Sequence, residues 1–323
     1  PFTCTACGRC KDACPTFLTG TPLSQKWVHD SLKHHLLAQR EAIVHPPAGD
    51  ESLPPLAGEV ISDDTLWACT TCGYCEAACP IELEHLPRFY RMRQHRVMMD
   101  GEFPHELKAV FSAYEVQSNP WGLPADTRGD WARGLPVRVV AGPGDLGPDD
   151  WLFYVGSAAS FDPRGQRIAR ALVTILRHAG VRFGILGAAE TSTGECVRRL
   201  GNEMVFQALA TTLVDTLNSV GAKRIVTTDP HAFNALKNEL GEFGGHYDVV
   251  HHTQAIDAWS TSGRLKVKPT HERVIYHEPC YLGRHNQEYD APRRILYAVS
   301  KDGPLEFELA AAADPRFLND VGT

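Results

Sequence analysis

Two stretches of the chain repeat one cysteine pattern, and this pattern constrains the fold more than any other feature of the sequence. The pattern is C-x2-C-x2-C-x3-C-P, which reads CTACGRCKDACP over residues 4–15 and CTTCGYCEAACP over residues 69–80. Three thiolates at this spacing wrap around one face of an iron–sulfur cube, and the proline then turns the chain away. Gly8 and Gly73 allow the backbone to pass close to sulfide. The repeated pattern therefore predicts two [4Fe–4S] clusters.

The fourth cysteine of each run is expected to serve the cluster of the other run, as it does in paired runs of this kind. This exchange would hold the two segments together and keep the clusters close enough for electron transfer. We therefore expect one cluster on Cys4, Cys7, Cys10 and Cys79, and the other on Cys69, Cys72, Cys75 and Cys14.

Structural zinc and disulfides are the alternatives to iron. Zinc sites usually take two C-x2-C pairs per ion, and a triple spacing followed by x3-C-P, present twice, is rarely a zinc site. A disulfide framework suits a short secreted domain rather than 323 residues without an export signal. Clusters with a purely structural role are a further alternative, but two adjacent clusters form a path for electrons.

Bulk composition excludes some functions. The formal net charge of −7 gives no support to nucleic-acid binding, so no nucleic-acid partner is expected. No apolar run approaches the roughly 18 residues that a membrane helix needs. The first residue is Pro1 rather than Met, and we expect the true start to lie upstream.

Hydrophobic periodicity divides the chain into parts. Residues 1–117 are expected to form a mostly helical domain, with helices at 24–42, 87–99 and 104–115. Prolines and glycines then make residues 118–150 a connector.

Beyond residue 150, short apolar runs alternate with helical stretches. This alternation predicts an α/β layer with a largely parallel sheet, so the fold class is α+β multidomain. The expected strands are 151–155, 181–186, 224–228, 247–251 and 273–276, and the expected helices are 164–179, 203–220, 231–240, 253–259 and 291–299.

Six further segments carry a family resemblance. They are LWACTTC (66–72), NPWG (119–122), YVG (154–156), RRLGNE (198–203), VHHT (250–253) and HEPCYLGR (277–284). With them the chain resembles iron–sulfur subunits that carry a cysteine-rich "CCG" domain. This group includes heterodisulfide reductase subunits, glycolate- and lactate-oxidising complexes, and membrane-bound oxidoreductases that take electrons from electron-transfer flavoprotein, which are the closest. The resemblance implies a helical ferredoxin domain, a first CCG-type lobe over 151–268 and the start of a second over 269–323.

The resemblance also implies a cluster site in the first lobe, whose cysteines this chain lacks. Ser, Asp and Ala are poor replacements for thiolates, so we expect no cluster there. In the second lobe Cys280 matches the family, whereas the segment nearest to the expected Cys-Cys-Gly, residues 317–322, holds no cysteine. The first-lobe positions without a thiol are Ser157, Ser192, Asp229 and Ala232.

Several of these positions share a place in the predicted fold. Ser157, Ser192, Asp229 and Cys280 each follow a predicted strand, and the carboxyl ends of parallel strands are where α/β sheets bind ligands. Cys280, with His277 nearby, is a candidate ligand or nucleophile, although a lone cysteine is more often a small core residue.

Three other features have both a structural and a functional interpretation. Cys196 is expected to cap or pack at a helix start. His251 and His252 are expected to point to opposite faces of a strand, one buried and one exposed, so that they would not share one metal ion. A basic run after the second cysteine stretch is either a solvated face or a docking surface for an acidic partner or anionic lipid; it comprises Arg88, Arg91, Arg93 and Arg96.

Three hypotheses for the function follow. The first is an electron-transfer subunit of a membrane-associated oxidoreductase at the cytoplasmic face of the cell membrane. It would pass electrons from electron-transfer flavoprotein or another flavoprotein to quinone, through a membrane-domain or quinone-reactive partner. Haem or quinone is expected only in that partner or a missing membrane part. The second is a heterodisulfide reductase-like catalytic subunit, and in the third the α/β lobes are only a docking scaffold.

Overall fold

The computed structural model describes residues 2–46, 53–270, 274–300 and 305–307. The chain forms two compact units, which are described separately. Unit 1 contains residues 1–105 together with the short segment Arg199–Asn202, and unit 2 contains Glu106–Arg198 and Glu203–Phe307. Helix α8 (Leu107–Gln117), which the sequence analysis placed with the first domain, thus lies in unit 2.

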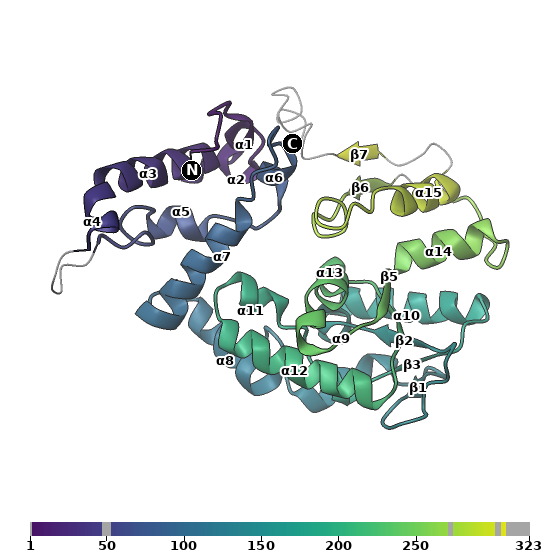
Figure 1. The fold of residues 1–323 in the computed structure, drawn as a ribbon. Coiled ribbons are helices and arrows are strands. Elements are labelled where there is room, and N and C mark those ends of the chain that lie inside the picture. The colour runs from purple at the N-terminus through teal and green to yellow at the C-terminus, as the bar shows by residue number, and fades with distance from the viewer. Residues whose placement is uncertain (1, 47–52, 271–273, 301–304, 308–323) are drawn as a thin grey trace. The chain divides into compact units, whose positions relative to one another are not determined.

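Unit 1 is built from helices, as predicted (Figure 1). The longest are α3 (Gln25–Ala38) and α7 (Leu86–His95), and α7 continues as a π-helical turn over Arg96–Asp100. Ser24 caps α3 by accepting a hydrogen bond from the backbone N–H of Trp27 at 3.3 Å. The shorter helices are α1 (Arg9–Asp12), α2 (Pro15–Leu18), α4 (Arg40–Val44), α5 (Asp63–Trp67) and α6 (Tyr74–Ala77).

A hydrophobic core joins α3, α5 and α7 within unit 1. Leu66 and Phe89 are fully buried in it, and two cysteines of the repeated runs, Cys14 and Cys69, belong to the same cluster of side chains. The remaining buried members are Leu23, Val28, Leu32, Ala57, Ile61, Leu86 and Met92. The core therefore fixes the backbone on which the cysteines stand.

Unit 2 contains the predicted parallel sheet. Five strands lie in the order β1-β3-β2-β4-β5, and every neighbouring pair is parallel. The strands β2 to β5 match predicted ones, whereas β1 comes from the segment expected to be only a connector. The strands are β1 (Arg138–Val139), β2 (Trp151–Tyr154), β3 (Phe183–Ile185), β4 (Arg224–Thr227) and β5 (Asp248–His251).

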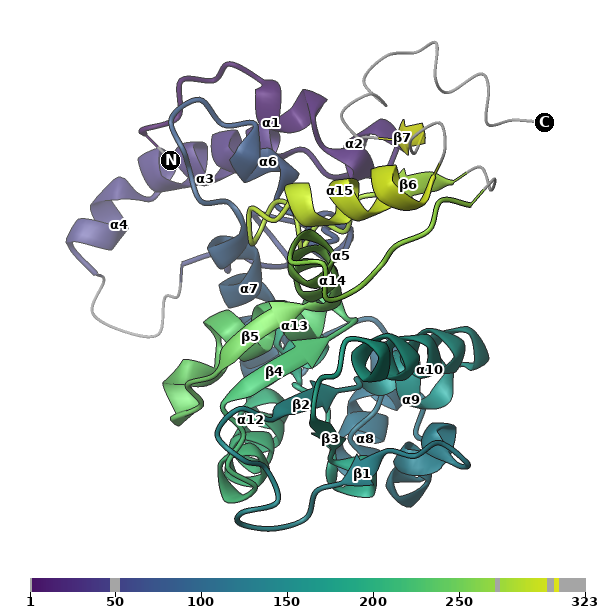
Figure 2. The ribbon, with the colours of Figure 1, turned by 90° about the vertical axis from the view of Figure 1, so that its right-hand side faces the viewer.

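Helices cover both faces of this sheet (Figure 2). On one face α10 (Pro163–His178) and α14 (His252–Thr261) share a core with Phe153 and Val226 of the strands. On the other face lies α12 (Glu203–Ser219). The other helical elements of this sheet's lobe are α9 (Ser157–Phe161), α11 (Glu195–Arg199), α13 (Pro230–Asn238) and 3-10 turns over Ala125–Ala132, Gly187–Ala189 and Leu240–Phe243.

The chain then begins a second, smaller sheet. Strand β6 (Ile275–His277) pairs in parallel with β7 (Leu305–Phe307), and α15 (Asp290–Val299) lies between them in sequence. Residues 317–322, the nearest candidate for a Cys-Cys-Gly segment, lie outside the described residues. Among the residues that the structure describes, no helix is both long and apolar enough to cross a membrane.

Candidate functional site

Four cysteines from the two runs line one cavity in unit 1. Cys4, Cys7 and Cys10 of the first run share it with Cys79 of the second run. Gly8 adopts a left-handed conformation (φ 86°) at the start of α1, which turns the loop so that its thiols face inward. The other lining residues are Thr5, Gly8, Lys26, Pro80, Ile81, Leu83 and His85.

The remaining four cysteines of the runs also lie near one another. Burial and the neighbouring Cys69, Cys72 and Cys14 raise the pKa of the Cys75 thiol. Cys14 stands at the start of α2; burial raises the pKa of its thiol, and Cys72 of the other run adds to the rise. The structure thus places Cys79 with Cys4, Cys7 and Cys10, and Cys14 near Cys72 and Cys75.

These two sets fit a strongly cationic group. Burial is the main cause that raises the pKa of Cys10, and likewise that of Cys69, to about 11. Ionising several such thiols side by side is unfavourable unless positive charge offsets their repulsion, and bound iron supplies that charge. The donor set, four thiols around a mostly apolar cavity, suits iron–sulfur ligation.

The basic run after the second cysteine stretch does not form a solvated face. Three of its four arginines are buried or partly buried, so the expectation of a solvated face was wrong for them. Arg93 is only 3% exposed, and its guanidinium donates to the carbonyl oxygens of Cys69 at 2.6 Å and Leu66 at 2.8 Å. Arg96 pairs with Asp63 and Asp100, and Arg88 is half-buried, so that only Arg91 is exposed. Helical spacing could have predicted the burial of Arg93, because Arg93 lies on the same face of the helix as the buried Leu86 and Phe89.

Arg88 is surrounded by imidazoles. Its Nη2 lies 2.9 Å from His85 Nδ1 and 2.9 Å from His29 Nε2. Burial, followed by the charge of Arg88, lowers the pKa of His29 and of His85 to about 4. Both imidazoles are therefore neutral near pH 7, and Arg88 carries the positive charge of the trio.

In unit 2 the positions without a thiol lie around the point where the strand order reverses. From β2 the chain crosses first to β3 on one side and then to β4 on the other, and ligands of α/β sheets bind at such a switch point. Ser157 follows β2, and Asp229 follows β4. At Gly156 (φ 80°) an added Cβ would come within 3.3 Å of an Asp229 carboxylate oxygen, so the two strand ends lie close together.

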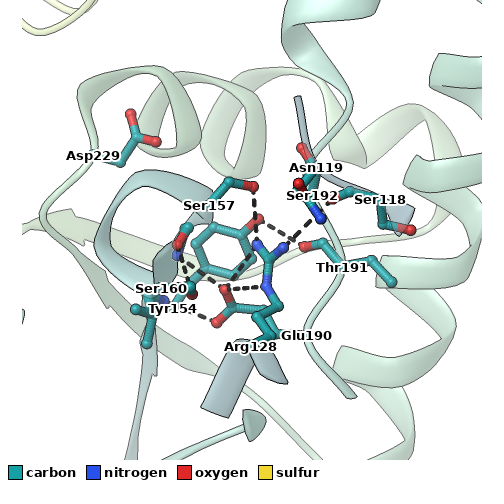
Figure 3. Close-up of polar contacts among 12 residues, drawn as sticks. Ser118, Asn119, Arg128, Tyr154, Ser157, Ser160, Glu190, Thr191, Ser192 and Asp229 are labelled. Carbon is teal, nitrogen blue, oxygen red and sulfur yellow. Dashed lines mark hydrogen bonds and ion pairs between the residues drawn. The ribbon is translucent and has the colours of Figure 1, made fainter. Parts of the chain in front are cut away.

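A buried ion pair occupies this region (Figure 3). The side chains of Arg128 and Glu190 are 1% and 2% exposed, and Nη2 of Arg128 lies 3.2 Å from Oε1 of Glu190. The same Nη2 donates to the hydroxyl of Ser157 at 3.2 Å. A guanidinium therefore lies against the first position where the family has a thiolate.

Glu190 is held by more than its arginine. Its two carboxylate oxygens accept backbone hydrogen bonds from Val155 and Gly156, both at 2.9 Å. Burial raises the pKa of Glu190, and the charge of Arg128 opposes that rise. The carboxylate thus ties the end of β2 to Arg128, which comes from the 3-10 turn within the expected connector.

The other three positions have local roles in the structure. Ser192 accepts a hydrogen bond from the backbone of Gly194 at 3.2 Å. Asp229 caps α13 by accepting from the backbone N–H groups of His231 and Ala232, at 2.8 and 3.3 Å. Ala232 is buried in that helix and offers no donor atom on its side chain. In Figure 3 no drawn bond joins Asp229 to the ion pair of Arg128 and Glu190.

His277 is the last residue of β6, and Cys280 follows three residues later. Cys280 is partly exposed. The ring of the next residue, Tyr281, lies against that of His231 in α13, with centroids 4.1 Å apart and planes tilted by 32°. This contact brings the loop that carries Cys280 to the start of α13, next to Asp229.

Two isolated features of the sequence are also located. Cys196 is the second residue of α11, and its thiol donates to Glu195 at 2.9 Å. His251 is buried, whereas His252 begins α14 and is only partly exposed. The two rings lie 4.3 Å apart rather than on opposite faces of a strand. Within the described ranges no group of three or more His, Cys, Asp or Glu is arranged around a single metal ion.

Comparison with known proteins identifies two domain families. Residues 2–83 match a family described as 4Fe-4S dicluster domain, and residues 152–237 match one described as cysteine-rich domain. No solved structure matches the chain significantly.

Curated relatives extend over most of the chain. An "EtfAB:quinone oxidoreductase" of Syntrophomonas wolfei is 37% identical over 92% of this chain and 44% of its own length. A "probable membrane-anchored ferredoxin" of Chromohalobacter salexigens is 37% identical over 93% of this chain and 47% of its own length. One subunit of the dihydromethanophenazine:CoB–CoM heterodisulfide reductase of Methanosarcina barkeri is 25% identical over 91% of this chain and 71% of its own length.

The chain thus spans less than half the length of the first two of these relatives. The two domain matches and the relatives agree with the cysteine pattern and with the parallel sheet. This chain is a homologue of iron–sulfur oxidoreductases, and it joins a 4Fe–4S dicluster domain to a cysteine-rich domain.

Proposed function

We propose that the chain is the iron–sulfur electron-transfer part of a membrane-associated oxidoreductase. It would take electrons from electron-transfer flavoprotein or another flavoprotein and pass them toward the quinone pool through a membrane-domain or quinone-reactive partner. The observation that carries the proposal is the cavity in which Cys79 of one run meets the three leading cysteines of the other. The relative named EtfAB:quinone oxidoreductase supports the choice of donor and acceptor.

Under this proposal the eight thiols have fixed roles. Cys4, Cys7, Cys10 and Cys79 hold one [4Fe–4S] cluster, and Cys69, Cys72, Cys75 and Cys14 hold the other. The clusters, when bound, supply one-electron transfer. The protein positions them through the crossed fourth cysteines, and it limits the access of water through the apolar residues that line the cavity.

The first cysteine-rich lobe is proposed to hold no cluster and to serve as a scaffold. Ser157, Asp229 and Ala232 offer hydroxyl, carboxylate and methyl groups where soft thiolates are needed. The guanidinium of Arg128, which is paired with Glu190, donates to Ser157 at the position where the family has a thiolate. The alternative, a heterodisulfide reductase-like activity in this lobe, has support from a relative's name but lacks the thiols.

A place at the membrane is also part of the proposal. The relative described as a membrane-anchored ferredoxin supports membrane association. The proposed reaction with a flavoprotein would take place at the cytoplasmic face. Any haem or quinone site would belong to the membrane partner.

The donor is tested by reduction of the anaerobically reconstituted chain. Fully reduced electron-transfer flavoprotein is mixed with it, and the visible absorption of the clusters and the EPR spectrum are followed. We expect bleaching and the signals of reduced [4Fe–4S] clusters, with no cluster reduction in a Cys10→Ser, Cys75→Ser double variant, which lacks one ligand from each set. If dithionite reduces the clusters but the flavoprotein does not, this donor is wrong.

A further inference from the structure

Arg88 is a half-buried cation that forms no ion pair with a carboxylate of the described residues. Its Nε is buried and has no hydrogen-bond partner among those residues. Its guanidinium donates instead toward the imidazoles of His29 and His85. An arginine in such a place is costly unless a nearby anion offsets its charge.

Burial lowers the pKa of Arg88, whereas Cys75, then Glu76, and then Cys4 and Cys10 oppose that shift, so cysteines of both sets lie near its guanidinium. Glu76 is already engaged, because its Oε1 accepts the backbone N–H groups of His85 and Leu86 at 2.6 and 2.7 Å.

Geometry places the same arginine next to one cysteine cavity. His85, whose Nδ1 accepts from Arg88, lines the cavity formed by Cys4, Cys7, Cys10 and Cys79. Arg88 also lies on α7, which starts shortly after the last cysteine of the second run. Phe89, which follows Arg88 in α7, is buried in the core of unit 1, and this burial fixes the turn of the helix that carries Arg88.

We propose that Arg88 is a counter-charge shared by both clusters and sets their reduction potentials; this inference rests on the proposed function. A cluster held by four thiolates is anionic, and its negative charge grows by one when it accepts an electron. A fixed positive charge nearby favours the reduced form, and more strongly where water is excluded. Arginine keeps its proton at any working pH, so this bias is permanent.

The test is a potentiometric titration of both clusters, followed by EPR at pH 8, where free imidazole is neutral. Arg88→Met and Arg88→Gln remove the charge, and Arg88→Lys retains it. Arg91→Met is the matched control, because Arg91 lies on the same helix and is exposed. At the wild-type midpoint potential of each cluster, that cluster is reduced in half of the molecules. At the same potentials we expect less than half of each cluster to be reduced in both neutral variants. Arg88→Lys and the control should stay close to one half.

The outcomes separate the inference from the function on which it rests. Unchanged midpoints in Arg88→Gln with full iron content would overturn the inference while leaving the proposed function intact. Wild-type chain without two [4Fe–4S] signals would instead remove the proposed function. If both neutral variants lose iron that Arg88→Lys retains, the charge is needed to bind the clusters, which supports the same counter-charge.

Discussion

Removal of the guanidinium of Arg128 tests whether the buried ion pair maintains the first cysteine-rich lobe. In Arg128→Met the side chain keeps much of its apolar length but loses its charge. Glu190, 2% exposed at its side chain, is then left as an unpaired carboxylate in the interior. Breaking a buried ion pair from one side costs about 3–5 kcal/mol of unfolding free energy. The backbone donors at Val155 and Gly156 remain, so we expect the lower end, about 3 kcal/mol.

A second substitution should restore part of that loss. In Arg128→Met, Glu190→Gln no charge is left in the interior, and the amide oxygen still accepts one of the two backbone N–H groups. The donors left unsatisfied, one backbone N–H and the new amide N–H groups, are neutral and cost less than an unpaired buried carboxylate, so the double variant should be more stable than the single one. Stability would be measured by urea unfolding followed by circular dichroism. An Arg128→Met midpoint equal to that of the wild type would refute the reasoning.

The pH dependence of the single variant has a definite sign. Burial already raises the folded-state pKa of Glu190 above its usual value, and loss of Arg128 raises it further. The folded state then binds a proton more tightly than the unfolded state, so protonation stabilises it. The loss of stability in Arg128→Met should therefore be full at pH 8 and shrink as the pH falls through the folded-state pKa of Glu190. A loss that grows toward low pH would contradict this.

Three further predictions concern unit 1. If the fourth cysteines cross, the double variant Cys4→Ser, Cys79→Ser loses ligands of one cluster only and should keep about half of the wild-type iron. The double variant Cys4→Ser, Cys14→Ser loses a ligand of each cluster and should lose nearly all of the iron. The reverse order of iron contents would favour uncrossed ligation. Lys26→Met should lower the midpoint of one cluster more than that of the other, because Lys26 lines the cavity with Cys4, Cys7, Cys10 and Cys79; equal shifts of both clusters in an EPR-monitored titration would contradict this. Gly201→Ala should lower the thermal midpoint, because Gly201 has φ 90° and its Cβ would lie 2.5 Å from the backbone of Arg93; an unchanged midpoint would contradict this packing.

The sequence predicted the elements whose signal is local. Strands β2 to β6 and the long helices follow from hydrophobic runs and periodicity, and the grouping of cysteines follows from their spacing. The π-helical turn after α7 and the left-handed start of α1 at Gly8 refine these elements without changing them.

The features that the sequence did not reveal depend on distant partners. Nothing near Arg128 indicates that it will meet Glu190, because 62 residues separate them and the segment has the composition of a connector. Strand β1 has only two residues, too few to produce an alternating pattern. By contrast, the burial of Arg93 could have been inferred, since it lies on the apolar face of its own helix. The sequence analysis treated the four arginines as one charged run, and such runs are usually solvated, so the burial of Arg93 was not predicted.

Iron and acid-labile sulfide per chain, measured together with the EPR spectrum of the reduced protein, test the central claim most directly. Two [4Fe–4S] clusters predict about eight irons and eight sulfides per chain, with the spectrum of two reduced clusters that interact with each other. A colourless protein that contains zinc would contradict the proposed electron-transfer function as a whole. Clearly more than eight irons would show that the first cysteine-rich lobe binds a cluster after all.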